Sequence, residues 1–220
     1  MTPKQADRLR QKIAAIRRAL AAEKRRFGAY DDSRGLRYFP TRYYVQLGDF
    51  AGGRTYVRWF AKSFPDDAGF TDFLLEWTII LFHTGQPAAA TQKALEAHCA
   101  DLHLFDRFLE RPSTPPEPWE PALQGADTEA RYFEALGRPT ALREFAAWLA
   151  AVTETEPFRL GARRFVDLNR QLHGEQDAEK RRSLVRQLYP PARKTPPRAP
   201  APSPAVRAND PDGSAIDREV

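Results

Sequence analysis

The sequence predicts an all-helical fold that is organised around residues 43–98. Apolar side chains recur in this stretch at intervals of three or four residues, which is the spacing of a helix that buries one face. Gly48 and Gly85 interrupt the apolar runs, and glycine readily takes the left-handed conformation that ends many helices. Each half of the stretch therefore has a helical run, a glycine-centred turn and a second helical run. We expect two antiparallel helical hairpins.

The composition is that of a soluble globular chain. Of 220 residues, 42% are hydrophobic and 29% are charged, which is enough for one domain with extensions. The longest apolar run, residues 73–82, contains Glu76 and is too short to cross a bilayer. The N-terminus lacks the apolar core of a secretory signal, and the single cysteine fits a reducing compartment. We expect a cytoplasmic protein without a membrane partner.

Charged side chains are segregated along the chain. Residues 1–42 hold 12 Lys and Arg against 4 Asp and Glu, a net charge of +8. Residues 43–156 hold 9 against 17, a net −8, and residues 157–220 hold 13 against 8, a net +5. The basic ends could fold onto the acidic middle or contact an anionic partner.

The first expected element is a basic helix at residues 4–26, within an N-terminal region of residues 1–30. Its apolar side chains form one narrow stripe: Leu9, Ile13, Ile16 and Leu20. The basic side chains on its other faces are Arg10, Arg17, Arg18, Lys24, Arg25 and Arg26. We favour a helix that docks on the domain through this stripe. The alternative is a nucleic-acid partner on the basic face.

A turn and then the two hairpins follow, within an expected core at residues 31–111. Asp31, Asp32 and Arg34 resemble an acid–base cluster, but a turn with local Asp-to-backbone hydrogen bonds is the preferred interpretation. A short helix should run from residue 40 to Gly48, and Asp49 should cap the next. The second hairpin repeats this order around Gly85.

The spacing of small residues in the hairpins resembles the tetratricopeptide repeat (TPR) family, whose units are helix–turn–helix hairpins of 34 residues. The matching residues are Gly48, Gly53 and Pro65 in the first unit and Gly85, Ala90 and Ala97 in the second. The two turn glycines are 37 residues apart, the second unit lacks the closing proline, and neither unit has the family's usual tryptophan near its start. The resemblance covers roughly residues 35–98.

The resemblance implies a short α-solenoid that binds a peptide or helix of another protein on a concave face lined by the first helix of each unit. By position, the partner-binding residues would be Tyr38, Arg42, Gln46, Asp72, Glu76, Ile79 and His83. This function is non-enzymatic. Because two hairpins cannot bury their apolar faces alone, other helices must cover them.

The downstream sequence supplies such helices. Residues 98–111 give a third apolar face, a proline-rich linker follows at residues 112–126, and helical spacing resumes over residues 127–189. We expect this C-terminal region to pack on the core. Residues 190–220 hold 8 prolines and few large apolar side chains, which predicts a disordered tail.

Side chains with possible chemistry are scattered. His98, Cys99 and His103 cluster, but their spacing does not complete a metal site. No phosphate-binding or catalytic motif is present, so we expect no metal, cofactor or reaction.

Glu76 lies within an apolar helical run and needs a partner such as Arg42 or Arg58 if it is buried. A structural ion pair is the preferred interpretation. A groove whose carboxylates bind a basic ligand is the alternative.

Overall fold

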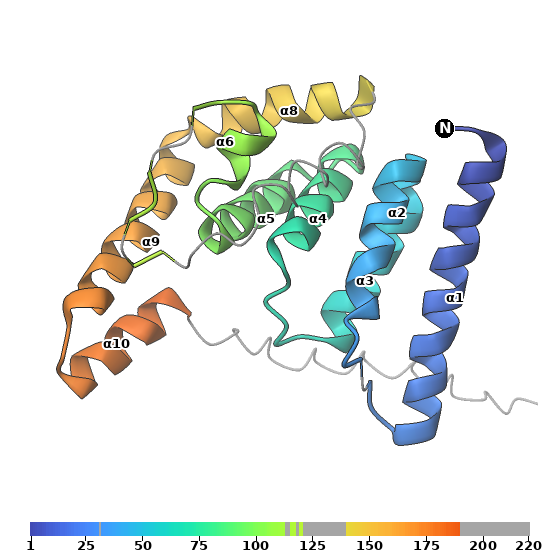
Figure 1. Ribbon diagram of the computed structural model, residues 1–220. Coiled ribbons are helices and arrows are strands. Elements are labelled where there is room, and N and C mark those ends of the chain that lie inside the picture. The colour runs from blue at the N-terminus through green and yellow to red at the C-terminus, as the bar shows by residue number, and fades with distance from the viewer. Residues whose placement is uncertain (31, 113–114, 118, 121–139, 190–220) are drawn as a thin grey trace, which may run out of the picture. The chain divides into compact units, whose positions relative to one another are not determined.

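A computed structural model describes residues 1–30, 32–112, 115–117, 119–120 and 140–189 of the chain (Figure 1). Every regular element in these residues is a helix, which confirms the all-helical prediction for this part of the chain. The helices are α1 (Pro3–Phe27), the 3-10 helix η1 (Leu36–Tyr38), α2 (Phe39–Leu47), α3 (Phe50–Ser63), α4 (Thr71–His83), α5 (Pro87–Ala100), α6 (Leu104–Phe108), α8 (Thr140–Thr153), α9 (Glu156–Gly174) and α10 (Ala178–Leu188).

Local sequence signals set the helix ends. The Thr2 side chain accepts a hydrogen bond from the Gln5 backbone while Gln5 bonds back to Thr2, a capping box that starts α1. Gly48 ends α2 in the left-handed conformation, with φ of 67°, as expected. Asp49 caps α3 by accepting from the Gly52 backbone at 2.9 Å.

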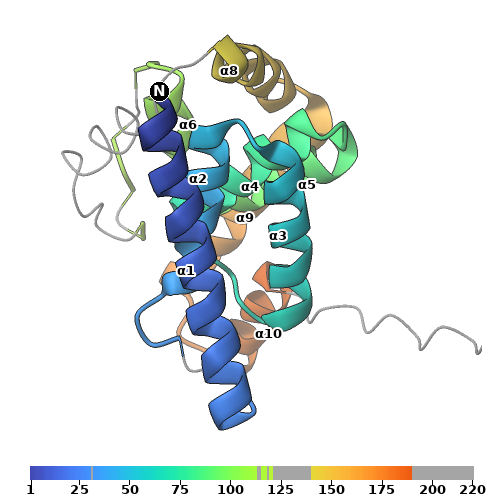
Figure 2. The same cartoon turned by 90° about the vertical axis from the view of Figure 1, so that its right-hand side faces the viewer.

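Helix α1 docks through its apolar stripe. It contacts α2 and η1, and Figure 2 shows it running alongside α2. Ile13 and Leu20 are buried, and Ile13 packs in a small cluster with Tyr44 and Tyr56. The preferred interpretation of this helix, docking on the domain, is therefore confirmed.

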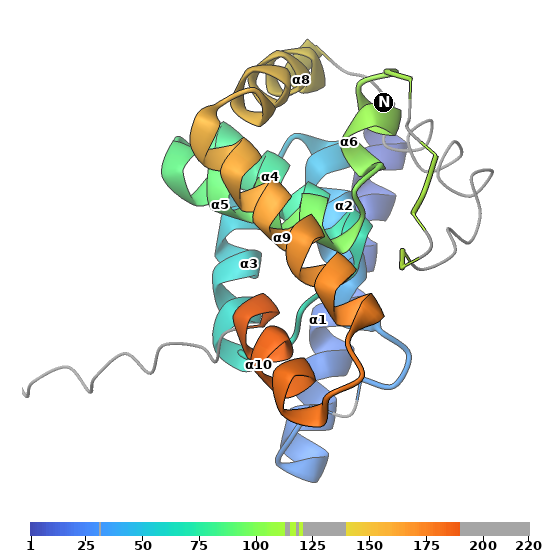
Figure 3. The same cartoon turned by 90° about the vertical axis from the view of Figure 1, so that its left-hand side faces the viewer.

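The two central hairpins, α2–α3 and α4–α5, pack on each other through α4, which contacts both α2 and α3. Gly53 makes this approach possible, because a Cβ there would lie 2.9 Å from Ile80 Cδ1 and 3.2 Å from Tyr44 Cβ. The side of the hairpins away from α1 is covered by later helices: α8 packs on α4, and α9 packs on α5 (Figure 3).

One apolar cluster joins the hairpins to the helices that follow the linker. Of its fifteen buried residues, five come from α8 and α9: Leu142, Phe145, Leu149, Val152 and Phe158. The core therefore includes side chains from residues 140–189 as well as from residues 45–105.

Several sequence predictions lie outside the described residues. They are the helical spacing expected over residues 127–139, most of the linker at residues 112–126, the tail at residues 190–220, and Asp31.

Candidate partner-binding site

Two residues of the expected partner-binding face are buried. Ile79 has no exposed surface and Glu76 has 1%. Ile79 belongs to the main apolar cluster, together with residues of α6 and α8. The chain's own helices therefore occupy the side of α4 that the sequence assigned to a partner, and the expected surface position of these two residues is wrong.

Glu76 takes part in a buried polar network between α2 and α4. Arg42 Nε lies 3.1 Å from Glu76 Oε1, and the Thr41 hydroxyl donates to Glu76 Oε2 at 2.5 Å. The Arg42 guanidinium also contacts Asp72 at 2.5 Å. The structural ion pair preferred from the sequence is thus confirmed, and Arg42 rather than Arg58 is the partner.

Burial controls the acidity of this carboxyl group. It raises the pKa of Glu76 to about 7, because burial removes water from the charged form. Arg42 and the hydroxyl of Thr41 oppose this rise, while the negative charge of Asp72 adds to it.

The remaining residues of the expected face are half-buried. Tyr38 donates its hydroxyl to Asp67 at 2.7 Å, which ties it to the connection between α3 and α4. His83 stacks on Phe50, with 4.1 Å between ring centroids. Gln46 lies on α2. Among these predicted residues, the structure brings Arg42, Asp72 and Glu76 together in one charged network.

The acidic turn before α2 is structural. Asp32 is buried and accepts hydrogen bonds from the backbone N–H groups of Leu36 and Arg37, both at 2.8 Å. The Arg37 guanidinium bridges Asp32 to Asp67. For Asp32, these bonds confirm the interpretation as a turn rather than an acid–base site.

The His98, Cys99 and His103 group divides into separate environments. His103 Nε2 lies 2.8 Å from a Glu120 carboxylate oxygen. His98 lies against the rings of Phe105 and Phe158, and burial raises the pKa of Cys99 to about 11. Across the described ranges, no group of three or more His, Cys, Asp or Glu side chains could hold a metal ion.

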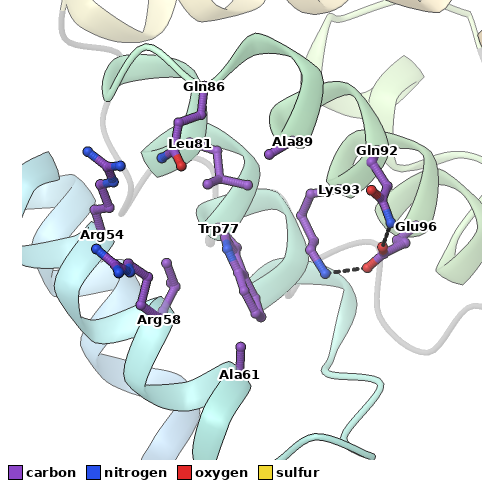
Figure 4. A pocket seen from close by; sticks show the side chains of 11 residues that line it. Arg54, Arg58, Ala61, Trp77, Leu81, Gln86, Ala89, Gln92, Lys93 and Glu96 are labelled. Atoms are coloured by element: carbon purple, nitrogen blue, oxygen red, sulfur yellow. Dashed lines mark hydrogen bonds and ion pairs between the residues drawn. The ribbon is translucent and has the colours of Figure 1, made fainter. Parts of the chain in front are cut away.

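A groove lies where α3, α4 and α5 meet (Figure 4). It has a volume of about 230 Å³. Its lining residues are Arg54, Val57, Arg58 and Ala61 from α3, Trp77 and Leu81 from α4, and Gln86, Ala89, Gln92, Lys93 and Glu96 from the α5 side.

The Trp77 ring forms the centre of this groove and is held from several directions. Phe60 and Phe73 pack edge-on against it, with ring centroids 5.8 and 5.6 Å away. The Lys93 ammonium lies 4.2 Å from the Trp77 ring centroid and pairs with Glu96. Arg54 and Arg58 are exposed on the opposite wall, one helical turn apart. The groove thus combines a fixed aromatic surface with a cationic rim.

Sequence reasoning missed this groove. It names Arg58 only as a possible partner of Glu76. The available signal was the pair Arg54 and Arg58, two basic residues on one helical face within the acidic middle of the chain. Lys93 and Glu96 could not be assigned to the same groove from the sequence, because their position relative to Arg54 and Arg58 depends on how α5 packs.

The basic residues of α1 lie on the surface. Arg10, Arg17, Arg18, Lys24, Arg25 and Arg26 are all exposed. Arg10 pairs with Asp7 at 2.8 Å, and Lys24 lies 5.2 Å from the ring centroid of Tyr30. Because α1 docks through its apolar stripe, its basic face remains exposed to solvent.

Comparisons of the chain with protein-family models, with curated proteins and with solved structures gave no significant match. The resemblance to TPR units therefore depends on the spacing of Gly48, Gly53, Pro65 and their counterparts alone. Among the helices that the structure describes, none is long and apolar enough to span a bilayer.

Proposed function

We propose that this chain is a non-enzymatic protein-interaction module that binds a segment of a partner protein in the groove between α3, α4 and α5. The observation that carries the proposal is the groove itself, in which Trp77 is flanked by Arg54 and Arg58. Tryptophan and arginine are the side chains that most often dominate the energy of protein interfaces. The ring contacts of Trp77 with Phe60 and Phe73 lower the cost of ordering it on binding.

The proposal includes a TPR-like arrangement of the hairpins. In it, α2–α3 and α4–α5 are the two units, and α1, α8 and α9 cover the apolar faces that two units leave open. The binding surface differs from the one expected from the family. Glu76 and Ile79 are buried by other helices of the chain, whereas the groove opens between the second helices of the two units.

The test narrows the groove by substitutions at exposed positions and leaves the buried core residues unchanged. Ala61 and Ala89 are exposed groove residues on α3 and α5, so Ala61→Gln with Ala89→Gln should narrow the groove while keeping good helix formers. Gln46→Ala, on the face expected from the sequence, is the matched variant. Both are compared with the unaltered chain by affinity purification with cross-linking mass spectrometry, after circular dichroism has verified the fold.

The groove proposal expects the double variant to lose partners that Gln46→Ala retains, with cross-links in the unaltered chain mapping to α3 and α5. Loss with Gln46→Ala alone would move the site to the α2–α4 face. Equal recovery from all three chains would overturn the groove as the binding site.

A second candidate function is nucleic-acid binding through α1. The observation in its favour is that the apolar stripe faces the domain, which leaves nine basic side chains exposed along one helix. Contacts with phosphates would make binding strongly salt-dependent. A gel-shift assay at low salt, with duplex DNA and single-stranded RNA, should detect a complex that Arg17→Gln with Arg18→Gln and Arg25→Gln weakens. An absence of any shift at about 50 mM salt would reject this function.

A further inference from the structure

We propose that the segment bound in this groove is an acidic peptide that carries one large apolar side chain. Its carboxylates would contact Arg54 and Arg58, and its apolar side chain would pack on Trp77 beside Leu81. This inference rests on the proposed function and specifies the chemistry of the partner.

The charges of the groove differ in sign from those of the surrounding sequence. Residues 43–156 carry a net charge of −8, yet the α3 wall of the groove presents Arg54 and Arg58 at i and i+4. The structure gives neither arginine an ion pair within the described residues. Two adjacent guanidinium groups without a carboxylate favour an anionic ligand, because arginine binds carboxylates in a bidentate geometry.

The opposite wall does not cancel this charge. Lys93 pairs with Glu96, so the one carboxylate among the lining residues is already matched by a cation. The lining residues therefore carry three cations against one anion, a net charge of +2. Gln86 and Gln92 on the same wall offer amide groups that could hydrogen-bond to a peptide backbone.

The size and the apolar lining of the groove define the rest of the ligand. A volume of about 230 Å³ is below the roughly 300–1,000 Å³ of most small-molecule pockets. It suits one anchoring side chain of a larger partner. Trp77, Leu81 and Ala61 give that side chain an apolar surface, and the exposed arginines lie at its edge.

The same charges argue for a protein segment rather than a nucleic acid. The lining residues carry a net charge of only +2, so the groove could match few phosphates of a polyanion. A peptide can confine its two carboxylates to the cationic wall. An acidic peptide is therefore the ligand that the groove fits best.

Selection from a peptide library tests this chemistry directly. Random dodecapeptides displayed on phage are selected on the immobilised full chain and, in parallel, on the variant Arg54→Glu with Arg58→Glu. Because both positions are exposed, the exchange should leave the fold intact. The full chain should enrich peptides with two Asp or Glu residues near a Leu, Phe or Trp, and the variant should enrich basic peptides.

The enriched peptides are then resynthesised and titrated by fluorescence anisotropy. Reversal of the charged pair should weaken binding of an acidic peptide by about tenfold or more, because it replaces two exposed attractions with two repulsions. The matched control, Arg18→Glu with Arg25→Glu, makes the same change of net charge on α1 and should leave the affinity within about twofold.

The outcomes separate this inference from the proposed function. Enriched peptides without acidic residues that are nevertheless lost with Ala61→Gln and Ala89→Gln would retain the groove and overturn the acidic ligand. An equal effect of the reversal on α1 would also overturn it, because the preference would then reflect net charge alone. If no enriched peptide depends on the groove, both the inference and the proposed function fail.

Discussion

Glu76 links two helices through a single buried carboxyl group. Thr41 and Arg42 of α2 both bond to it, although Glu76 belongs to α4 and is almost completely buried. Removing a charge from water costs several kcal/mol, so the network stabilises the fold only while its partners stay in place. Burial raises the pKa of Glu76 to about 7, with Arg42 opposing the rise. Its protonation is therefore linked to folding.

The link predicts a specific dependence of stability on pH. Between the ordinary pKa of 4.5 and about 7, the folded chain retains a proton on Glu76 that the unfolded chain releases. The unfolded state thus binds fewer protons, and the free energy of unfolding should fall as pH rises through this range, by an amount on the order of a few kcal/mol. Above about pH 7 this contribution should level off.

Urea unfolding at pH 4.5, 5.5, 6.5 and 7.5 measures the effect, with Glu76→Gln as the comparison. The variant keeps the shape of the side chain but cannot titrate, so the difference between the two chains isolates this carboxyl group. If the free energy of unfolding varies with pH in the same way for both chains, the raised pKa of Glu76 would be contradicted.

Gly53 predicts a steric effect at the same helix contact. A Cβ at this position would lie within 3.0 Å of two Ile80 side-chain atoms, and Ile80 is itself fully buried. Gly53→Val should therefore lower the free energy of unfolding by about 1–3 kcal/mol. At Gly174, the last residue of α9, an added Cβ would meet no atoms within 4 Å, so Gly174→Val should change stability by less than about 0.5 kcal/mol. Similar effects of the two substitutions in chemical denaturation would refute the close approach.

At the scale of elements, local signals in the sequence predicted where several helices begin and end. Gly48 and Asp49 act on neighbouring backbone groups, so the end of α2 and the start of α3 can be inferred without tertiary information. The same holds for the stripe of α1, because its spacing alone shows which face must be buried.

The position of a helix face relative to distant elements could not be inferred in this way. Ile79 was expected on a binding face, but α8, which begins at Thr140, packs on α4 and shares its apolar cluster. Nothing in the periodicity of α4 distinguishes a face covered by the same chain from one left for a partner. The groove was missed for the same reason, because its walls come from three helices.

The docking of α1 can be tested by removing one apolar contact. Leu20 has 1% of its surface exposed, so Leu20→Ala should cost about 2–5 kcal/mol and speed amide hydrogen exchange in α1. Arg18, which is exposed two residues earlier on the same helix, is the matched position, and Arg18→Ala should cost less than about 0.5 kcal/mol. Unchanged exchange in the Leu20 variant would show that α1 is not held by its stripe.

At the scale of the whole molecule, most of the buried apolar side chains in the described residues belong to one continuous cluster. The described helices lie in a single compact unit, and the main apolar cluster draws on both sides of the proline-rich linker. The two hairpins resemble repeats that need additional helices to cover them, and α8 and α9 contact α4 and α5 in that way. The groove between α3, α4 and α5 should therefore require the C-terminal helices for its stability.

A shortened chain, residues 1–111, tests this dependence. It lacks the five buried side chains of α8 and α9 in the main cluster, and burial of each such side chain contributes about 1.5–3 kcal/mol. That sum is comparable with the total stability of about 5–15 kcal/mol of a typical domain. The shortened chain should therefore lose its cooperative urea transition and bind a hydrophobic dye. Residues 1–189 keep every described helix and should unfold cooperatively, like the full chain. A cooperative transition for residues 1–111 at the full chain's midpoint would show that the hairpins are stable without the helices that cover them.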